Sequence, residues 1–92
     1  HVAKVVELNG FDIDVPVSTH MAFFRYHDRP GVVGQVGNLL GNSGINIAGM
    51  QVSRDDEGHA LMVLTVDSLL THELMDQIIT DIGAHTGKAV TL

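Results

Sequence analysis

The chain has 92 residues, carries a formal net charge of −6 at pH 7 and contains no cysteine. This length supports one small hydrophobic core, and the acidic balance disfavours nucleic acid and anionic membranes as main partners. The lack of cysteine excludes a disulfide framework and a thiolate metal site, and it is compatible with a cytoplasmic location. No apolar run reaches the roughly 18 residues of a membrane span.

Two short β-type runs open the chain, at residues 4–8 and 11–15, on either side of Asn9 and Gly10. Asn-Gly between such runs predicts a β-hairpin, because both turn positions need a positive φ. A hairpin of this size is not stable alone, and the chain begins with His1 rather than methionine. We therefore interpret residues 1–19 as a hairpin and connector at the end of a preceding domain, and residues 20–92 as a separate domain.

The domain from residue 20 onward shows the order strand, helix, strand, strand, helix, strand. The predicted elements are a strand near 21–24, a helix over 31–42, strands over 45–54 and 59–67, a helix starting after Ser68 or Thr71 and ending at Gly83, and a strand over 88–92. This order predicts an α+β fold, a ferredoxin-like βαββαβ sandwich with a four-stranded antiparallel sheet and two helices on one face.

Glycines carry several of the more specific predictions. Gly34, Gly37 and Gly41 lie near one another on the first predicted helix. Because an interior glycine costs about 1 kcal/mol relative to alanine, a smooth surface for close backbone approach is expected there. Gly44 is predicted to end this helix in a left-handed conformation. Gly49 lies where the apolar alternation of the next strand slips, which predicts a β-bulge.

The segment that joins the first strand to the first helix is the candidate binding site. Pro30 suits the first turn of a helix, so the free backbone N–H groups of that turn would follow Asp28 closely. Such a helix start attracts a small anion, for example an amino-acid carboxylate. If Asn46 returns beside the end of the first strand, Asp28 can take an ammonium group while Asn46 and the helix amides take a carboxylate. The pattern predicts binding rather than catalysis.

The same residues have plainer explanations. Asp28 suits a turn or helix cap, Asn46 suits a loop after the Gly44 cap, and Tyr26 suits strand packing. The three are assigned to a site because all of them are expected to flank one helix start. No catalytic residues are predicted, because no nucleophile lies at a recognisable spacing from a base.

Other ligand classes find little support in the sequence. The six histidines show neither the i, i+4 helical spacing nor the i, i+2 strand spacing of a metal site, although His27 and His59 are able to meet across the sheet. Residues 34–37 lack the spacing of a nucleotide-binding glycine loop and lie inside an apolar-periodic helix. An RNA-binding sheet needs aromatic residues on its central strands, whereas residues 61–64 are aliphatic. No metal or cofactor is therefore predicted within this chain.

Two segments carry a family resemblance. Residues 28–34 (DRPGVVG) and 44–48 (GINIA) resemble an ACT domain, the amino-acid-sensing module of many metabolic enzymes, and the resemblance covers about residues 20–92. The early hairpin with residues 50–52 is similar to the C-terminal end of the D-3-phosphoglycerate dehydrogenases, which oxidise 3-phosphoglycerate with NAD in serine synthesis. This resemblance implies an NAD-dependent parent enzyme whose catalytic and NAD-binding residues lie upstream.

The resemblance also implies an effector site. In that family L-serine binds between two ACT domains and inhibits the enzyme. Carried over by position, the implied serine contacts are Tyr26, Asp28, Gly31, Val32, Val33, Asn46 and Ile47, with the helix start contributing backbone. Some members have His at the Tyr26 position and Asn at the Asp28 position, and both versions can hydrogen-bond serine. A homo-oligomer formed by side-by-side pairing is implied as well.

Two alternatives keep the ACT domain but change its role. In one, the parent is an iron–sulfur L-serine dehydratase, whose β-chain ends similarly. In the other, the domain only holds subunits together and binds no effector. A dinucleotide-binding glycine motif upstream would favour the dehydrogenase over the dehydratase.

Overall fold

The computed structural model describes residues 5–8, 11–14 and 20–91. In chain order the elements are β1 (Val5–Leu8), β2 (Phe11–Asp14), β3 (His20–His27), α1 (Val32–Asn42), β4 (Ile47–Arg54), β5 (His59–Val66), α2 (His72–Ile82) and β6 (Thr86–Thr91). From β3 onward this is the predicted βαββαβ order. β3 extends three residues further than predicted, to His27, and β6 begins two residues earlier, at Thr86.

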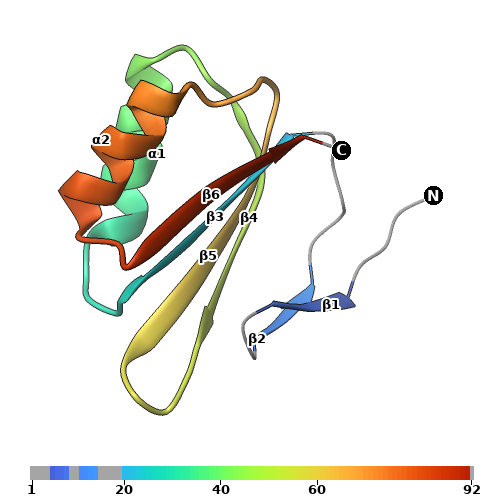
Figure 1. Ribbon diagram of the computed structural model, residues 1–92, viewed down its shortest axis with the longest axis vertical. Coiled ribbons are helices and arrows are strands. Elements are labelled where there is room, and N and C mark those ends of the chain that lie inside the picture. The colour runs from blue at the N-terminus through green and yellow to red at the C-terminus, as the bar shows by residue number, and fades with distance from the viewer. Residues whose placement is uncertain (1–4, 9–10, 15–19, 92) are drawn as a thin grey trace.

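The four strands β3 to β6 form one antiparallel sheet in the order β4-β5-β3-β6. Both helices pack on the same face of this sheet (Figure 1). This is the ferredoxin-like sandwich predicted from the element order. Because β5 separates β3 from β4 and is antiparallel to both, β3 and β4 run parallel to each other. The end of β3 therefore lies at the same end of the sheet as the end of β4.

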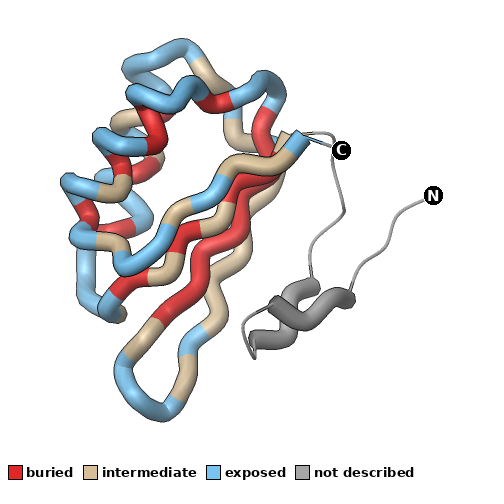
Figure 2. Tube along the Cα trace, in the orientation of Figure 1, coloured by how far each residue is buried: buried red, intermediate tan, exposed pale blue. Residues whose placement is uncertain are grey.

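The main core lies between the sheet and the helices. Buried residues follow the inner faces of both helices and the central strands (Figure 2). The core side chains include Phe24 of β3, Leu40 of α1 and Ile78 of α2, each 0% exposed. β5 is buried on both faces, as its continuous apolar sequence predicted. A second, smaller cluster of Met21, Leu61 and Val63 lies on the sheet face opposite the helices.

The helix ends agree with most of the capping predictions. After α1, Gly44 has φ 75°, and the N–H of Ile45 donates to the carbonyl of Leu40 at 2.9 Å, which is a Schellman ending. The hydroxyl of Thr71, not Ser68, caps α2 by accepting from the N–H of Leu74 at 3.1 Å. Gly83 ends α2 with φ 65°.

The predicted bulge is present in β4. The register with β5 shifts between Ile47 and Gly49, and a Cβ at Gly49 would lie 2.7 Å from the Thr65 hydroxyl. Glycine is required there because β5 approaches so closely. At the other end of the chain, β1 and β2 pair antiparallel with Leu8 opposite Phe11, which leaves two residues to connect them. That turn and the connector after β2 lie outside the described residues.

Candidate functional site

The N-terminus of α1 is open. Gly31 is the N-cap, in the left-handed conformation with φ 90°, and no side chain caps the helix. The first turn also contains no acidic residue. The N–H groups at the start of a helix have no partner within it, and the helix dipole makes this end attractive to anions. Pro30 lies just before the N-cap, two residues ahead of the first helical residue Val32, so the prediction that it occupies the first turn was wrong.

Asp28 and Arg54 form an ion pair beside this helix start. Arg54 Nε lies 2.9 Å from Asp28 Oδ2, and the N–H of Asp28 donates to the carbonyl of Gly58 at 2.8 Å. Asp28, Arg29, Pro30 and Arg54 line a shallow hollow of about 270 Å³. The Arg54 side chain is 59% exposed, so the pair contributes little stability and the charges of a ligand can compete for either partner.

Arg54 was not among the residues expected from the sequence. The signal that identifies it is topological. A strand–helix–strand crossover makes the two strands parallel, so the end of the second strand lies near the end of the first. The register agrees, because Arg54 and Tyr26 both pair with Ala60, from opposite sides of β5.

Arg29 connects the two helices at this end. Its Nη2 donates to the carbonyl of Ile82, in the last turn of α2, at 3.0 Å. Its Nη1 lies 3.5 Å from Oε1 of Gln35 in α1. The guanidinium therefore neutralises the negative end of the α2 dipole and holds the start of α1 in place.

Tyr26 is part of the core, with 1% of its surface exposed. Burial raises the pKa of its hydroxyl, and the negative charge of Asp28 raises this pKa further. The neutral hydroxyl is thus coupled to the Asp28 site, while most of the side chain packs as an ordinary core residue. Val32 is also buried, at 1%, so only its backbone is available to a ligand, whereas Val33 is 43% exposed.

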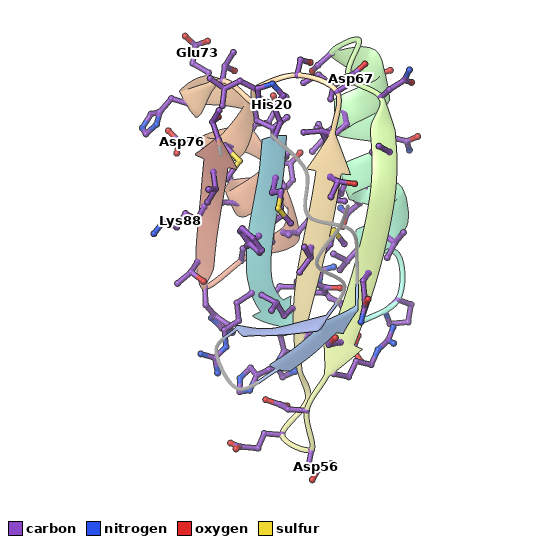
Figure 3. The ribbon with its side chains drawn as sticks, turned by 90° about the vertical axis from the view of Figure 1, so that its right-hand side faces the viewer. His20, Asp56, Asp67, Glu73, Asp76 and Lys88 are labelled. Atoms are coloured by element: carbon purple, nitrogen blue, oxygen red, sulfur yellow. The ribbon has the colours of Figure 1, made fainter. Side chains whose placement is uncertain are left out.

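Asn46 and Ile47 lie at the opposite end of the sheet. Asn46 and Asp67 exchange two hydrogen bonds, from the N–H of Asn46 to Oδ1 of Asp67 and from the N–H of Asp67 to the carbonyl of Asn46, both 3.1 Å. Figure 3 shows Asp67 at one end of the sheet and Asp56, in the turn that contacts Asp28, at the other. The length of β5 separates them by roughly 25 Å.

The expectation that Asn46 joins Asp28 within one chain is therefore wrong. β4 starts at the same end of the sheet as β3, because the crossover through α1 makes the two strands parallel. It is Arg54, at the far end of β4, that reaches Asp28. A site that uses both Asp28 and Asn46 requires two copies of the chain.

The histidines meet as the sequence allowed, and one more joins them. The rings of His27 and His59 are 5.9 Å apart between centroids, and those of His59 and His85 are 5.5 Å apart. Over the residues that the structure describes, however, no three histidine or carboxylate side chains are arranged to hold a metal ion. No helix in that part of the chain is long and apolar enough to cross a membrane.

The geometry at the α1 start suits a small zwitterion. The open amides and Arg54 offer contacts to a carboxylate, and Asp28 offers one to an ammonium group. Comparison with protein families agrees with the resemblance seen in the sequence, because the family model of the ACT domain matches residues 20–82. The chain belongs to the ACT domain family.

Curated relatives of this ACT domain are named D-3-phosphoglycerate dehydrogenase. That of Bacillus subtilis is 40% identical over 76 residues, which are 82% of this chain and 14% of the relative. That of Synechocystis is 36% identical over 90 residues, 97% of this chain and 16% of the relative. That of Mycobacterium leprae is 34% identical over 92 residues, 99% of this chain and 17% of the relative. The chain thus spans about a sixth of the length of these relatives.

Proposed function

We propose that this ACT domain binds an amino acid, L-serine, at an interface between two copies and so provides feedback control of a D-3-phosphoglycerate dehydrogenase. The parent enzyme would be a cytoplasmic, NAD-dependent oxidoreductase, with its cofactor and catalytic residues in other domains. The names of the relatives favour this parent over an L-serine dehydratase. The observation that carries the proposal is the uncapped start of α1 beside the exposed Asp28–Arg54 pair.

A second copy supplies what one chain lacks. β4 is an edge strand of the four-stranded sheet and pairs only with β5 among its strands. An unpaired edge invites pairing with another chain. If two β4 strands pair antiparallel about a twofold axis, the Asn46 end of one copy lies beside the Arg54 end of the other. Asn46 of the second copy then lies beside Asp28 and the α1 start of the first copy. The twofold axis repeats this arrangement, so each dimer contains two such sites.

The glycines of α1 support a contact with another chain. A Cβ added at Gly34, Gly37 or Gly41 would meet nothing within 4 Å, so packing within the described part of the chain does not explain these glycines. Gln35 lies on the other flank of α1. Arg29 contacts both Gln35 and the carbonyl of Ile82 in α2, so this flank faces α2. The glycine flank therefore faces away from α2, on the side of the β4 edge, where a second copy can approach closely.

Regulation follows from the composite site. A ligand held by two copies favours their paired arrangement over any looser one, because it binds the paired state with higher affinity. A coupling of about 1–3 kcal/mol between effector site and active site is typical of such control. Asp28 and Arg54 would exchange part of their mutual contact for the ammonium and carboxylate groups of serine.

Titration calorimetry of the 92-residue chain with L-serine tests the proposal. We expect saturable heat with L-serine and none with ethanolamine, which keeps the ammonium group and the hydroxyl but lacks the carboxylate. Asp28→Ala and Asn46→Ala should each abolish the heat, while sedimentation still shows a dimer. Heat with another amino acid but not with serine would contradict the choice of effector. A dimer without any amino-acid response would contradict the binding role and leave only an oligomerising one.

A further inference from the structure

A second hollow lies on the sheet face opposite the helices. It has a volume of about 410 Å³ and is lined by residues of three strands, namely Phe23, Arg25, Leu61, Thr86, Gly87, Lys88 and Val90. This volume is within the range of small-molecule sites. The apolar walls come from β3, β5 and β6, and the polar groups are two cations and the Thr86 hydroxyl. This hollow shares no residue with the one at the α1 start.

Arg25 is the unexplained group in this hollow. Its Nε is buried and has no hydrogen-bond partner. A buried donor without a partner is costly, and where one occurs it commonly awaits an ion, water or ligand. A guanidinium group is suited to a carboxylate or phosphate, because its N–H groups match both oxygens.

Asp55, whose pKa is lowered by the charge of Arg25, does not form an ion pair with it. Asp55 Oδ1 already accepts from the backbone N–H groups of His59 and Glu57, both at 2.9 Å, and Oδ2 lies 3.6 Å from the His59 ring. The hydrogen bond from the His59 backbone lowers the pKa of Asp55, and the charge of Arg25 lowers it by a smaller amount. Arg25 thus senses Asp55 from a distance without forming an ion pair with it.

Lys88 supplies a second cation at the rim. The register places Arg25 opposite Thr86 and Phe23 opposite Lys88, so Arg25 and Lys88 are diagonal neighbours on one face. The side chain of Lys88 extends outward from the β6 edge in Figure 3. Among the side chains of residues 20–91 neither residue makes an ion pair, whereas Arg54 and Arg29 are engaged at the α1 end. In a chain of net charge −6, these two cations form a local site of opposite sign.

We propose that this hollow binds a small organic anion that carries an apolar body, with Arg25 holding the anionic group and Phe23, Leu61 and Val90 holding the body. Lys88 swings toward the anion from the rim and contributes less than Arg25. The ligand class follows from the lining, since a fully polar anion would leave the apolar walls unused. The site is separate from the amino-acid site proposed above and does not depend on it.

Linear carboxylates probe the proposal on the 92-residue chain. Calorimetry with acetate, butyrate and hexanoate should show one saturable site whose affinity rises about fourfold for each added methylene that becomes buried. Hexanamide, which keeps the tail and lacks the charge, should bind at least tenfold more weakly. Equal affinity of acetate and hexanoate would overturn the apolar part of the site, and equal affinity of hexanamide would overturn the anionic part.

Substitutions locate the site. Arg25→Gln should weaken hexanoate binding at least tenfold, and Lys88→Gln two- to fivefold. Arg54→Gln removes the same charge at the other hollow and should leave hexanoate binding unchanged while weakening serine binding. Undiminished hexanoate binding by Arg25→Gln, or no binding by the unmodified chain, would overturn the proposal. Thermal unfolding shows whether Arg25→Gln still folds. If it does not, the variants Lys88→Gln and Val90→Thr test the proposal instead. Full hexanoate binding by both would overturn the proposal.

Discussion

Helices α1 and α2 have eleven residues each and occupy equivalent places in two strand–helix–strand crossovers, yet their ends are built differently. α2 has a threonine cap at its start, an acidic residue in its first turn and a hydrogen bond from Arg29 to the carbonyl of Ile82 in its last turn. α1 has neither a side-chain cap nor an acidic residue at its start, and it contains three glycines. The comparison teaches that α2 is stabilised at both ends, whereas the start of α1 is left without a cap, as the proposed amino-acid site requires.

The largest expected effect is one that the two helices share. Leu40→Ala in α1 and Ile78→Ala in α2 each remove a fully buried side chain, so each should lower the free energy of unfolding by about 2–5 kcal/mol. Urea denaturation measures both, with Leu40→Met as a volume-conserving control that should cost less than about 1.5 kcal/mol. A loss for Leu40→Ala far below that for Ile78→Ala would mean that α1 is not an equal part of the core.

The next effect is specific to the start of α1. Gly31 has φ 90°, and no atom lies within 4 Å of the place that an added Cβ would take, so Gly31→Ala should cost roughly 1–2 kcal/mol through backbone strain alone. Gly31→Asn should cost less, because asparagine tolerates the left-handed conformation better. Thermal unfolding distinguishes the two, and an Ala variant as stable as the unmodified chain would contradict the left-handed N-cap.

The corresponding test on α2 removes its cap. Thr71→Ala deletes the hydroxyl that accepts from the N–H of Leu74 and should destabilise the chain by about 1 kcal/mol. Thr71→Ser keeps the hydroxyl and should be close to neutral. Equal urea midpoints for Ala and Ser would show that α2 does not depend on this cap.

The smallest effect has the opposite sign. Gly34 is exposed in the helix interior, with nothing within 4 Å of an added Cβ, so Gly34→Ala should stabilise the separate chain by about 0.5–1 kcal/mol. If the glycine flank of α1 is a pairing surface, the same substitution weakens self-association in sedimentation equilibrium. Gln77→Ala, on the exposed face of α2, is the matched control and should leave association unchanged. Unchanged association for Gly34→Ala would contradict the pairing surface.

Local patterns in the sequence were sufficient for the fold. Apolar periodicity predicted the element order and, through its slip at Gly49, the bulge. The chemistry of Thr71, Gly83 and Gly44 predicted a cap and two helix ends, because each of these depends on neighbours in the chain. Predicting the site, in contrast, required knowing which strand ends lie at the same end of the sheet. The expected meeting of Asp28 with Asn46 ignored the parallel relation of β3 and β4, and the same relation would have identified Arg54.

The hollow around Arg25 could not be predicted from local sequence patterns, for a different reason. Its lining residues come from three strands, and their shared face follows from the register between those strands, which short-range periodicity does not determine. Arg25 and Lys88 are ordinary, separate charges in the sequence. Only the pairing of Arg25 with Thr86 and of Phe23 with Lys88 brings both cations to one apolar wall.

The most direct test of the central claim mixes two variants that do not bind. If the pairing is as proposed, Asp28→Ala and Asn46→Ala chains each form dimers in which both composite sites lack one contact. After subunit exchange, half of the dimers are mixed and each carries one intact site, so about a quarter of the L-serine binding capacity should return in calorimetry. Recovery of that fraction supports a site shared between two copies, and no recovery in mixed dimers would contradict it.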